Sequence, residues 1–208
     1  MGTNIGHQIR KLYEPDLYPG NPTERIFQRF FGAGRRFEVC SYGFEPNPLH
    51  SRRLKDIELA YRRRGIRITM HTETAVSDYD GNATLYLDHA AGEHNEWGAG
   101  LTTNALADKV HLEKIIVRTV DIARWFAFTV QRGATVVMKS DIETLDEKVL
   151  NHLYHTGQLC HVQLVYGEHL SQAWLDNIGR LLEKDRCTTR IELLDDESGD
   201  DGLGLPFS

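Results

Sequence analysis

The stretch VVMKSDIETLDEKVLNHLYHTGQLCHVQLVY, residues 136–166, holds a strand, a helix and a second strand in direct succession. Apolar, β-rich runs at Thr135–Lys139 and Val162–Tyr166 predict the two strands. Between them, Gly157 can end a helix whose apolar face recurs at i, i+4 and i+8, at Leu145, Val149 and Leu153. Such units cross over right-handed and place the carboxyl ends of parallel strands at one edge of a sheet, where ligands bind.

The same alternation extends over most of the chain. Further strands are predicted at 37–44, 66–72, 83–87, 114–120 and 190–194. One helix is predicted between its cap at Asn47 and Gly65, and another from Ser171 onward. The sequence therefore predicts an α/β fold, namely a doubly wound, mostly parallel sheet with helices on both faces. Residues 89–112 show no sustained period and are expected to form a loop.

The composition is that of one globular domain. Of 208 residues, 40% are hydrophobic and 26% charged, and no run of about 20 apolar residues could cross a membrane. Five acids at 195–208 supply most of the formal net charge of -6, so the body lacks the basic surface that nucleic acid requires. We expect a domain at 1–194, followed by a solvated, mobile acidic tail at 195–208.

The cysteines at 40, 160 and 187 form no CxxC pair. Because no apolar signal region is present at the start, we expect reduced thiols in a cytoplasmic protein. His152 and His155 on one predicted helix are expected to be exposed, and no metal site is predicted.

A glycine turn, Gly2-Thr3-Asn4-Ile5-Gly6, precedes a polar, helix-like stretch at 7–12. Glycines let backbone approach a ligand, and the start of a helix offers free N–H groups to an anionic group such as a carboxylate. Taken alone, the turn is equally compatible with a flexible terminus, because no hydrophobic strand precedes it.

Phe44-Glu45-Pro46-Asn47-Pro48 puts a carboxylate at the end of a strand, where it can accept two hydrogen bonds from a ribose diol. The alternative is an exposed loop acid beside an ordinary helix cap at Asn47. Asp141 and Glu143 likewise follow an apolar strand, where one can hold a cationic ammonium and the other can orient a substrate hydroxyl or take its proton. The alternative makes both acids favourable partners of the next helix dipole.

Together these segments resemble the FkbM family of class I, S-adenosylmethionine-dependent methyltransferases. The motifs occur in the order GTNIG at 2–6, FEPNP at 44–48, TAVSDYDG at 74–81, TVDIARWF at 119–126, VVMKSDIE at 136–143 and VYGEH at 165–169. The resemblance implies a Rossmann-like fold that binds S-adenosylmethionine through Gly2, Asn4, Gly6, Glu45, Asn47, Ala75, Val76 and Asp141. It places Gly2, Asn4 and Gly6 at the methionine part, Glu45 at the ribose, and Ala75 and Val76 near the adenine.

By the same resemblance Asp141 and Glu143 face the reacting methyl group, with Glu168 and His169 at the neighbouring strand end. The implied reaction is O-methylation of a small-molecule or sugar hydroxyl. Three departures stand against the family pattern: Thr144 replaces a glycine, Gly167 is inserted before Glu168, and no strand precedes the glycine turn. That strand is central in the family, so we expect a truncated chain with either a gap or a direct pairing between segments 37–44 and 135–140.

Two other functions fit parts of this pattern. A nicotinamide-dependent oxidoreductase shares the glycine turn and the ribose acid, but its acid follows the glycines by roughly 20 residues. Here Glu45 stands 39 positions after Gly6. A catalytically degenerate, methyltransferase-like binding module is the other alternative, and it is favoured by the missing strand and by Thr144.

Overall fold

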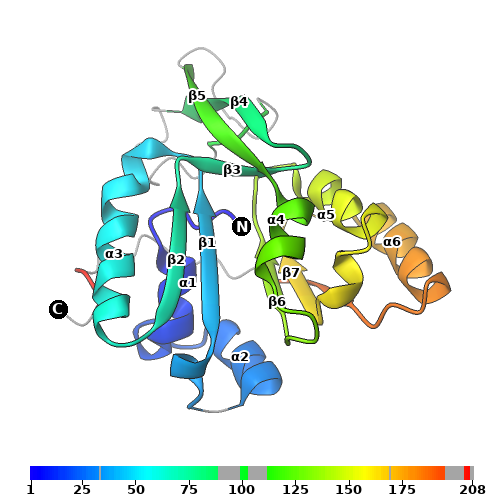
Figure 1. Cartoon of the computed structure of the whole chain (residues 1–208), viewed down its shortest axis with the longest axis horizontal. Coiled ribbons are helices and arrows are strands. Elements are labelled where there is room, and N and C mark those ends of the chain that lie inside the picture. Colours follow the sequence, from blue (N-terminus) through cyan, green and yellow to red (C-terminus); the bar gives the residue numbers. More distant parts are fainter. Residues whose placement is uncertain (33, 89–98, 103–111, 169, 195–203, 207–208) are drawn as a thin grey trace.

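The computed structural model describes residues 1–32, 34–88, 99–102, 112–168, 170–194 and 204–206, and its strands form three sheets (Figure 1). One is a parallel pair of β1 (Cys40–Glu45) and β2 (Arg67–Thr72). A second is parallel throughout and consists of β6 (Val137–Ser140), β7 (Leu164–Gly167) and β8 (Arg190–Leu193). In the third, β5 (Leu112–Asp121) lies between β3 (Thr74–Ser77), which is parallel to it, and the antiparallel β4 (Gly81–Asp88).

In the described ranges, six α-helices alternate with these strands: α1 (His7–Tyr13), α2 (Thr23–Phe31), α3 (Ser51–Arg63), α4 (Ile122–Thr129), α5 (Asp146–His155) and α6 (Gln172–Lys184). The predicted helix starts at Asn47 and Ser171 and the predicted helix end at Gly157 are confirmed. Asn47 Oδ1 accepts from the Leu49 N–H ahead of α3, and Ser171 Oγ accepts from the Trp174 N–H at the start of α6. Gly157 follows α5 with a φ of 75°, in the left-handed region that favours glycine.

The α/β class and the mostly parallel pairing are confirmed, but the described strands do not join into one continuous sheet. The predicted strand at 37–44 begins later than expected, because residues 36–38 form a 3-10 turn. The four-residue β3 and the helix α2 were not predicted. β3 is too short to show a period, and Phe27 is the only large apolar side chain of α2 that is buried.

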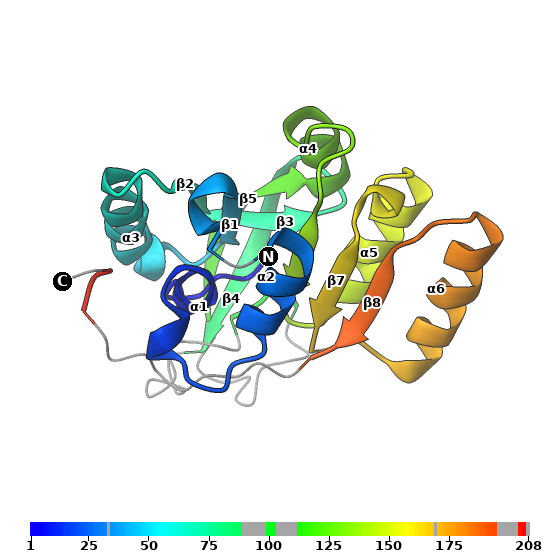
Figure 2. The ribbon, with the colours of Figure 1, turned by 90° about the horizontal axis from the view of Figure 1, so that it is seen from below.

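Different helices pack against each of the two parallel sheets. Leu54 and Ile57 of α3 are fully buried and pack with Ile68 and Met70 of β2. A second core joins α4, α5 and α6 to β7 around Phe126, Leu150, Val165 and Ile178. Figures 1 and 2 show α4 on one side of the sheets and α1 on the other. The second core also includes Phe44 of β1, and a third one, around Leu85 and Val117, belongs to the sheet of β3, β4 and β5.

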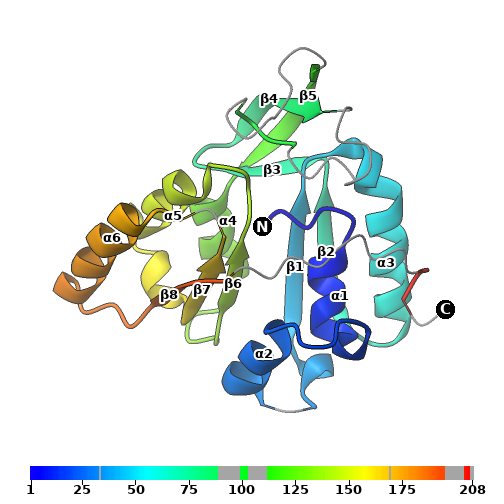
Figure 3. The same ribbon diagram turned by 180° about the vertical axis from the view of Figure 1, so that it is seen from behind.

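The sequence left two arrangements open, a gap or a direct pairing between segments 37–44 and 135–140, and the structure has the gap, between β1 and β6. Within the described part of the chain, β1 pairs with β2 alone and β6 with β7 alone. The amino terminus lies between the two strands at their carboxyl ends (Figures 1 and 3). The Gly2 N–H donates to Phe44 O at 3.2 Å, and the Met1 amino group donates to Lys139 O at 2.7 Å. Residues 1–3 thus connect the two strands at one end.

The expectation of three reduced thiols is wrong for two of them. Cys160 and Cys187 are joined by a disulfide, with their Cα atoms 5.0 Å apart, and Cys40 is free and exposed. Cys160 lies in the 3-10 turn at Leu159–His161 and Cys187 lies between α6 and β8, 27 positions later, so the fold brings them together. In the tail, the structure describes 204–206, where Gly204 O accepts from Arg10 Nη1 at 2.7 Å. Of the described helices, none is both long and apolar enough to cross a membrane.

Candidate functional site

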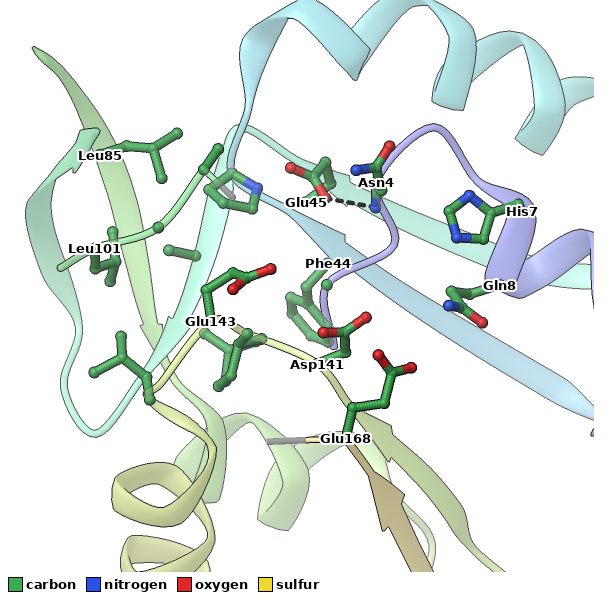
Figure 4. Close-up of a pocket in the computed structure, with 18 residues that line it drawn as sticks. Asn4, His7, Gln8, Phe44, Glu45, Leu85, Leu101, Asp141, Glu143 and Glu168 are labelled. Carbon is green, nitrogen blue, oxygen red and sulfur yellow. Dashed lines mark hydrogen bonds between the residues drawn. The ribbon is translucent and has the colours of Figure 1, made fainter. Parts of the chain in front are cut away.

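One cavity lies where the carboxyl ends of β1, β6 and β7 meet the middle of β3 (Figure 4). Separate segments of the sequence bring predicted site residues to its wall, namely Gly2, Asn4, Glu45, Ala75, Val76, Asp141, Glu143 and Glu168. β6 and β7 are paired in parallel, and residues 1–3 bond to the ends of both β1 and β6, so motifs far apart in the sequence reach one place.

The glycine turn fits between β1 and β6 because Gly2 has no side chain. Gly2 has a φ of +75°, and a Cβ atom there would lie 1.7 Å from the carbonyl oxygen of Asp141. The N–H groups of Gly2 and Thr3 both donate to Phe44 O. The turn is therefore fixed between the end of β1 and the acidic segment after β6.

The Glu45 carboxylate is buried and held by backbone. Its side chain reaches the cavity wall, although the residue is only 6% exposed. Oε2 accepts from the Asn4 N–H at 2.7 Å and Oε1 from the Asn47 N–H at 2.9 Å, and His50 Nδ1 lies 3.7 Å from Oε1. The alternative of an exposed loop acid is therefore wrong. Asn47, which is fully buried, positions Glu45 and does not itself line the cavity.

The acids in the first turn of the helix after β6 are Asp146 and Glu147, not Asp141 and Glu143. Helix α5 begins at Asp146, which is fully buried and accepts hydrogen bonds from Ser140 Oγ and the Ile142 N–H. Burial and the nearby Asp141 carboxylate raise the pKa of Asp146 above its ordinary value. Asp141 and Glu143 line the cavity instead (Figure 4).

Lys139 joins the ends of two neighbouring strands. Its Nζ lies 3.3 Å from Asp141 Oδ2 and 3.0 Å from Glu168 Oε1, and its side chain is 8% exposed. Four carboxylates still share the cavity wall, at Glu45, Asp141, Glu143 and Glu168. An excess of negative charge in a partly enclosed site favours a cationic ligand.

The other end of the cavity is apolar. Ala75 and Val76 of β3 and Leu85 of β4 are buried and form part of its wall. Tyr86 pairs with Gly100 through two backbone hydrogen bonds, which brings Leu101 to the same wall. Residues 99–101 of the predicted loop thus contribute to the site, and 89–98 and 103–111 lie outside the described residues.

Some predicted site residues are elsewhere. Gly6, the last residue of the turn, faces α3, where a Cβ atom would be 2.7 Å from Ile57 Cδ1. His169 lies outside the described residues. His7 and Gln8 line the cavity from α1 and were not predicted from the sequence. Their position directly after the glycine turn is the signal that could have identified them. The apolar wall residues Phe44, Leu85 and Leu101 were also missed. Phe44 stands in the FEPNP motif, whereas Leu85 and Leu101 belong to no motif.

Two departures from the FkbM pattern have structural consequences. Thr144 has a φ of 71°, following Glu143 at 52°, so a β-branched residue occupies a left-handed position that favours glycine. At Gly167, a Cβ atom would lie 2.7 Å from Ser140 O, so the close approach of β6 and β7 requires a glycine there.

Comparisons of the chain with protein-family models, curated proteins and solved structures find no match. Within the described residues, no group of three or more His, Cys, Asp or Glu side chains could hold a metal ion.

Proposed function

We propose that this chain binds S-adenosylmethionine in the cavity and transfers its methyl group to a hydroxyl of a small molecule or sugar. The observation that carries the proposal is the Glu45 carboxylate, fixed by two backbone N–H groups at the end of β1 and facing the wall shared by Asn4, Ala75 and Asp141. Five of the six FkbM-like motifs contribute residues to this cavity wall, and TVDIARWF does not. The class I methyltransferase fold is part of the proposal.

The residues present fit the chemistry of that cofactor. Each Glu45 oxygen has lone-pair capacity beyond its one backbone donor, so the carboxylate can accept from a ribose diol. Ala75, Val76 and Leu85 offer an apolar surface for adenine. Asp141, Glu143 and Glu168 offer negative charge to a ligand that carries an ammonium and a sulfonium.

When bound, the cofactor supplies an electrophilic methyl group on sulfur. Held by Glu45, Ala75 and Asp141, it would supply that methyl group to the acceptor oxygen and leave as S-adenosylhomocysteine, which keeps the electron pair of the carbon–sulfur bond. The hydroxyl proton leaves to a carboxylate, for which Asp141 and Glu143 are the candidates, with Glu168 beside them. Alignment of the acceptor with the methyl group can contribute several kcal/mol to the rate, so a strong base is not required.

A degenerate binding module is the second candidate. The observation in its favour is the unpaired interval between β1 and β6, because no described strand supports the turn at 2–6 from that interval. Such a protein binds the same ligand without transferring the methyl group.

Calorimetry with S-adenosylmethionine, S-adenosylhomocysteine and NAD tests the proposal. We expect both sulfur ligands to bind and NAD to give no heat. Tight NAD binding without binding of either sulfur ligand would establish the nicotinamide alternative. If S-adenosylmethionine binds but no S-adenosylhomocysteine is formed from it with any of a panel of hydroxyl acceptors, the binding module is favoured.

A further inference from the structure

A second cavity lies where β5 runs into α4, beside the turn that links β3 to β4 (Figure 1). It is an open groove with a volume of about 720 Å³, and no described residue lines both this groove and the cavity of the proposed cofactor. Its wall includes Asp80, Asn82, Arg118, Arg124, Trp125 and Phe128, and it is called the α4 groove below. The proposed methyl transfer uses none of these side chains.

Two aromatic side chains of α4 line this groove. Phe128 is 84% exposed and follows Trp125 by three positions, so the two lie on the same side of the helix. The Trp125 ring makes T-shaped contacts with three other rings. They are Tyr42 and Phe44, each with centroids 5.0 Å away, and His71, at 5.8 Å. Because these contacts fix the Trp125 ring, it offers a preorganised surface on which a flat ring can stack.

Arg118 adds a positive charge to the groove. Its side chain is exposed on β5, and among the described residues no carboxylate forms an ion pair with it. Arg124 is already paired, because its Nη1 lies 2.7 Å from Asp80 Oδ2. The charged wall residues of the groove therefore leave one cation without a partner. A guanidinium group can bind a carboxylate or a phosphate through two parallel hydrogen bonds.

Together the rings and the free cation favour one class of ligand. A flat aromatic ring can stack on Trp125 and Phe128 while an anionic group on the same molecule pairs with Arg118. A neutral sugar could also stack on these rings, but it would leave the Arg118 charge without a partner. We propose that the α4 groove is a binding site for a small molecule in which an aromatic ring carries a carboxylate or a phosphate. This proposal does not rest on methyl transfer.

NMR titration of the isotope-labelled chain tests the proposal, with the backbone amides of 118–129 as the readout. We expect naphthoate or naphthyl phosphate to shift these signals saturably, and the stronger of the two identifies the preferred anion. Naphthalene methanol lacks the charge and cyclohexane carboxylate lacks the aromatic ring, so each should bind more weakly by about tenfold. No saturable shift with either naphthyl anion overturns the proposal, as does tighter binding of naphthalene methanol or glucose. Shifts centred on Asn4 would place the anion in the other cavity and would also overturn it.

Two variants separate the contribution of the charge from that of the rings. Arg118→Gln should weaken naphthoate binding by about tenfold and leave naphthalene methanol unaffected, whereas Phe128→Ser should weaken both. Both positions are exposed, so the melting temperature should stay unchanged. Arg180→Gln removes an exposed arginine on α6 and is the matched control, which should bind as the parent chain does. Equal affinity for naphthoate in Arg118→Gln and Arg180→Gln overturns the proposal.

Discussion

The backbone N–H of Asn4 donates a 2.7 Å hydrogen bond to Oε2 of Glu45 and so fixes the glycine turn to the end of β1. The second carboxylate oxygen is held in the same way by Asn47. Because both oxygens are restrained by backbone, the orientation of this carboxylate is set before any ligand arrives, which lowers the entropy cost of binding.

Replacing Glu45 should therefore weaken ligand binding. Glu45→Ala is expected to raise the free energy of S-adenosylhomocysteine binding by about 1.5–3 kcal/mol, because a hydrogen bond to a charged group is lost. Calorimetry measures the dissociation constant, and thermal unfolding checks that the variant folds. Glu183→Ala, at an exposed position on α6, is the control and should bind as the parent chain does. An unchanged dissociation constant in Glu45→Ala would remove Glu45 from the site.

The acids after β6 should separate into functional and structural ones. Asp141→Asn and Glu143→Gln are expected to reduce release of S-adenosylhomocysteine, measured with a panel of hydroxyl acceptors, more than they reduce the melting temperature. Asp146→Asn should do the reverse, with a loss of about 1–3 kcal/mol in the free energy of unfolding, because it disturbs buried hydrogen bonds to Ser140 and Ile142. Parallel losses of activity and stability in Asp141→Asn would argue for a structural role.

Thr144→Gly should stabilise the protein. The backbone of Thr144 has a φ of 71°, which strains a β-branched residue by about 1–3 kcal/mol. The substitution also loses an exposed hydrogen bond to Thr102, so we expect a net gain of about 1 kcal/mol in the free energy of unfolding. Denaturant unfolding measures it, and Thr156→Gly, which has no such strain, should give no gain. A loss of stability in Thr144→Gly would contradict the strain argument.

The amino group of Met1 should make stability depend on pH. Burial, together with the nearby Lys139, lowers the pKa of this group from 8.0 to about 6. The unfolded chain then binds more protons than the folded one between pH 6 and 8, so the free energy of unfolding should rise across that window, by about 2 kcal/mol. Below pH 6 the contribution is constant and at its lowest.

Acetylation of this amino group provides the control, since it retains the N–H that donates to Lys139 and removes the titration. Urea unfolding from pH 5.5 to 8.5 should show a flatter profile for the acetylated chain. All other ionisable groups are the same in both chains, so their contributions cancel in the difference. Two superimposable profiles would show that the amino group is exposed in solution.

The sequence by itself determined those features that depend on neighbours along the chain. Asn47 and Ser171 cap helices, Gly65 and Gly157 follow them with positive φ angles, and the apolar runs mark most of the strands. Each depends on hydrogen bonds or side-chain spacing within a few residues, so a local pattern predicts it. For the same reason, Glu45 and Asp141 could be recognised as strand-end acids from their place directly after apolar runs.

Only the tertiary structure decided which strand edges pair and what lies between them. It separated β1 from β6, joined Cys160 to Cys187, assigned the turn after β6 to Asp146 and brought Leu85 and Leu101 to the cavity wall. These relationships connect residues through space, and their free energies depend on burial and on close approach, as at Gly2 beside Asp141. An apolar run looks the same in sequence whether its edge is paired or open, because the partner that decides this lies elsewhere in the fold.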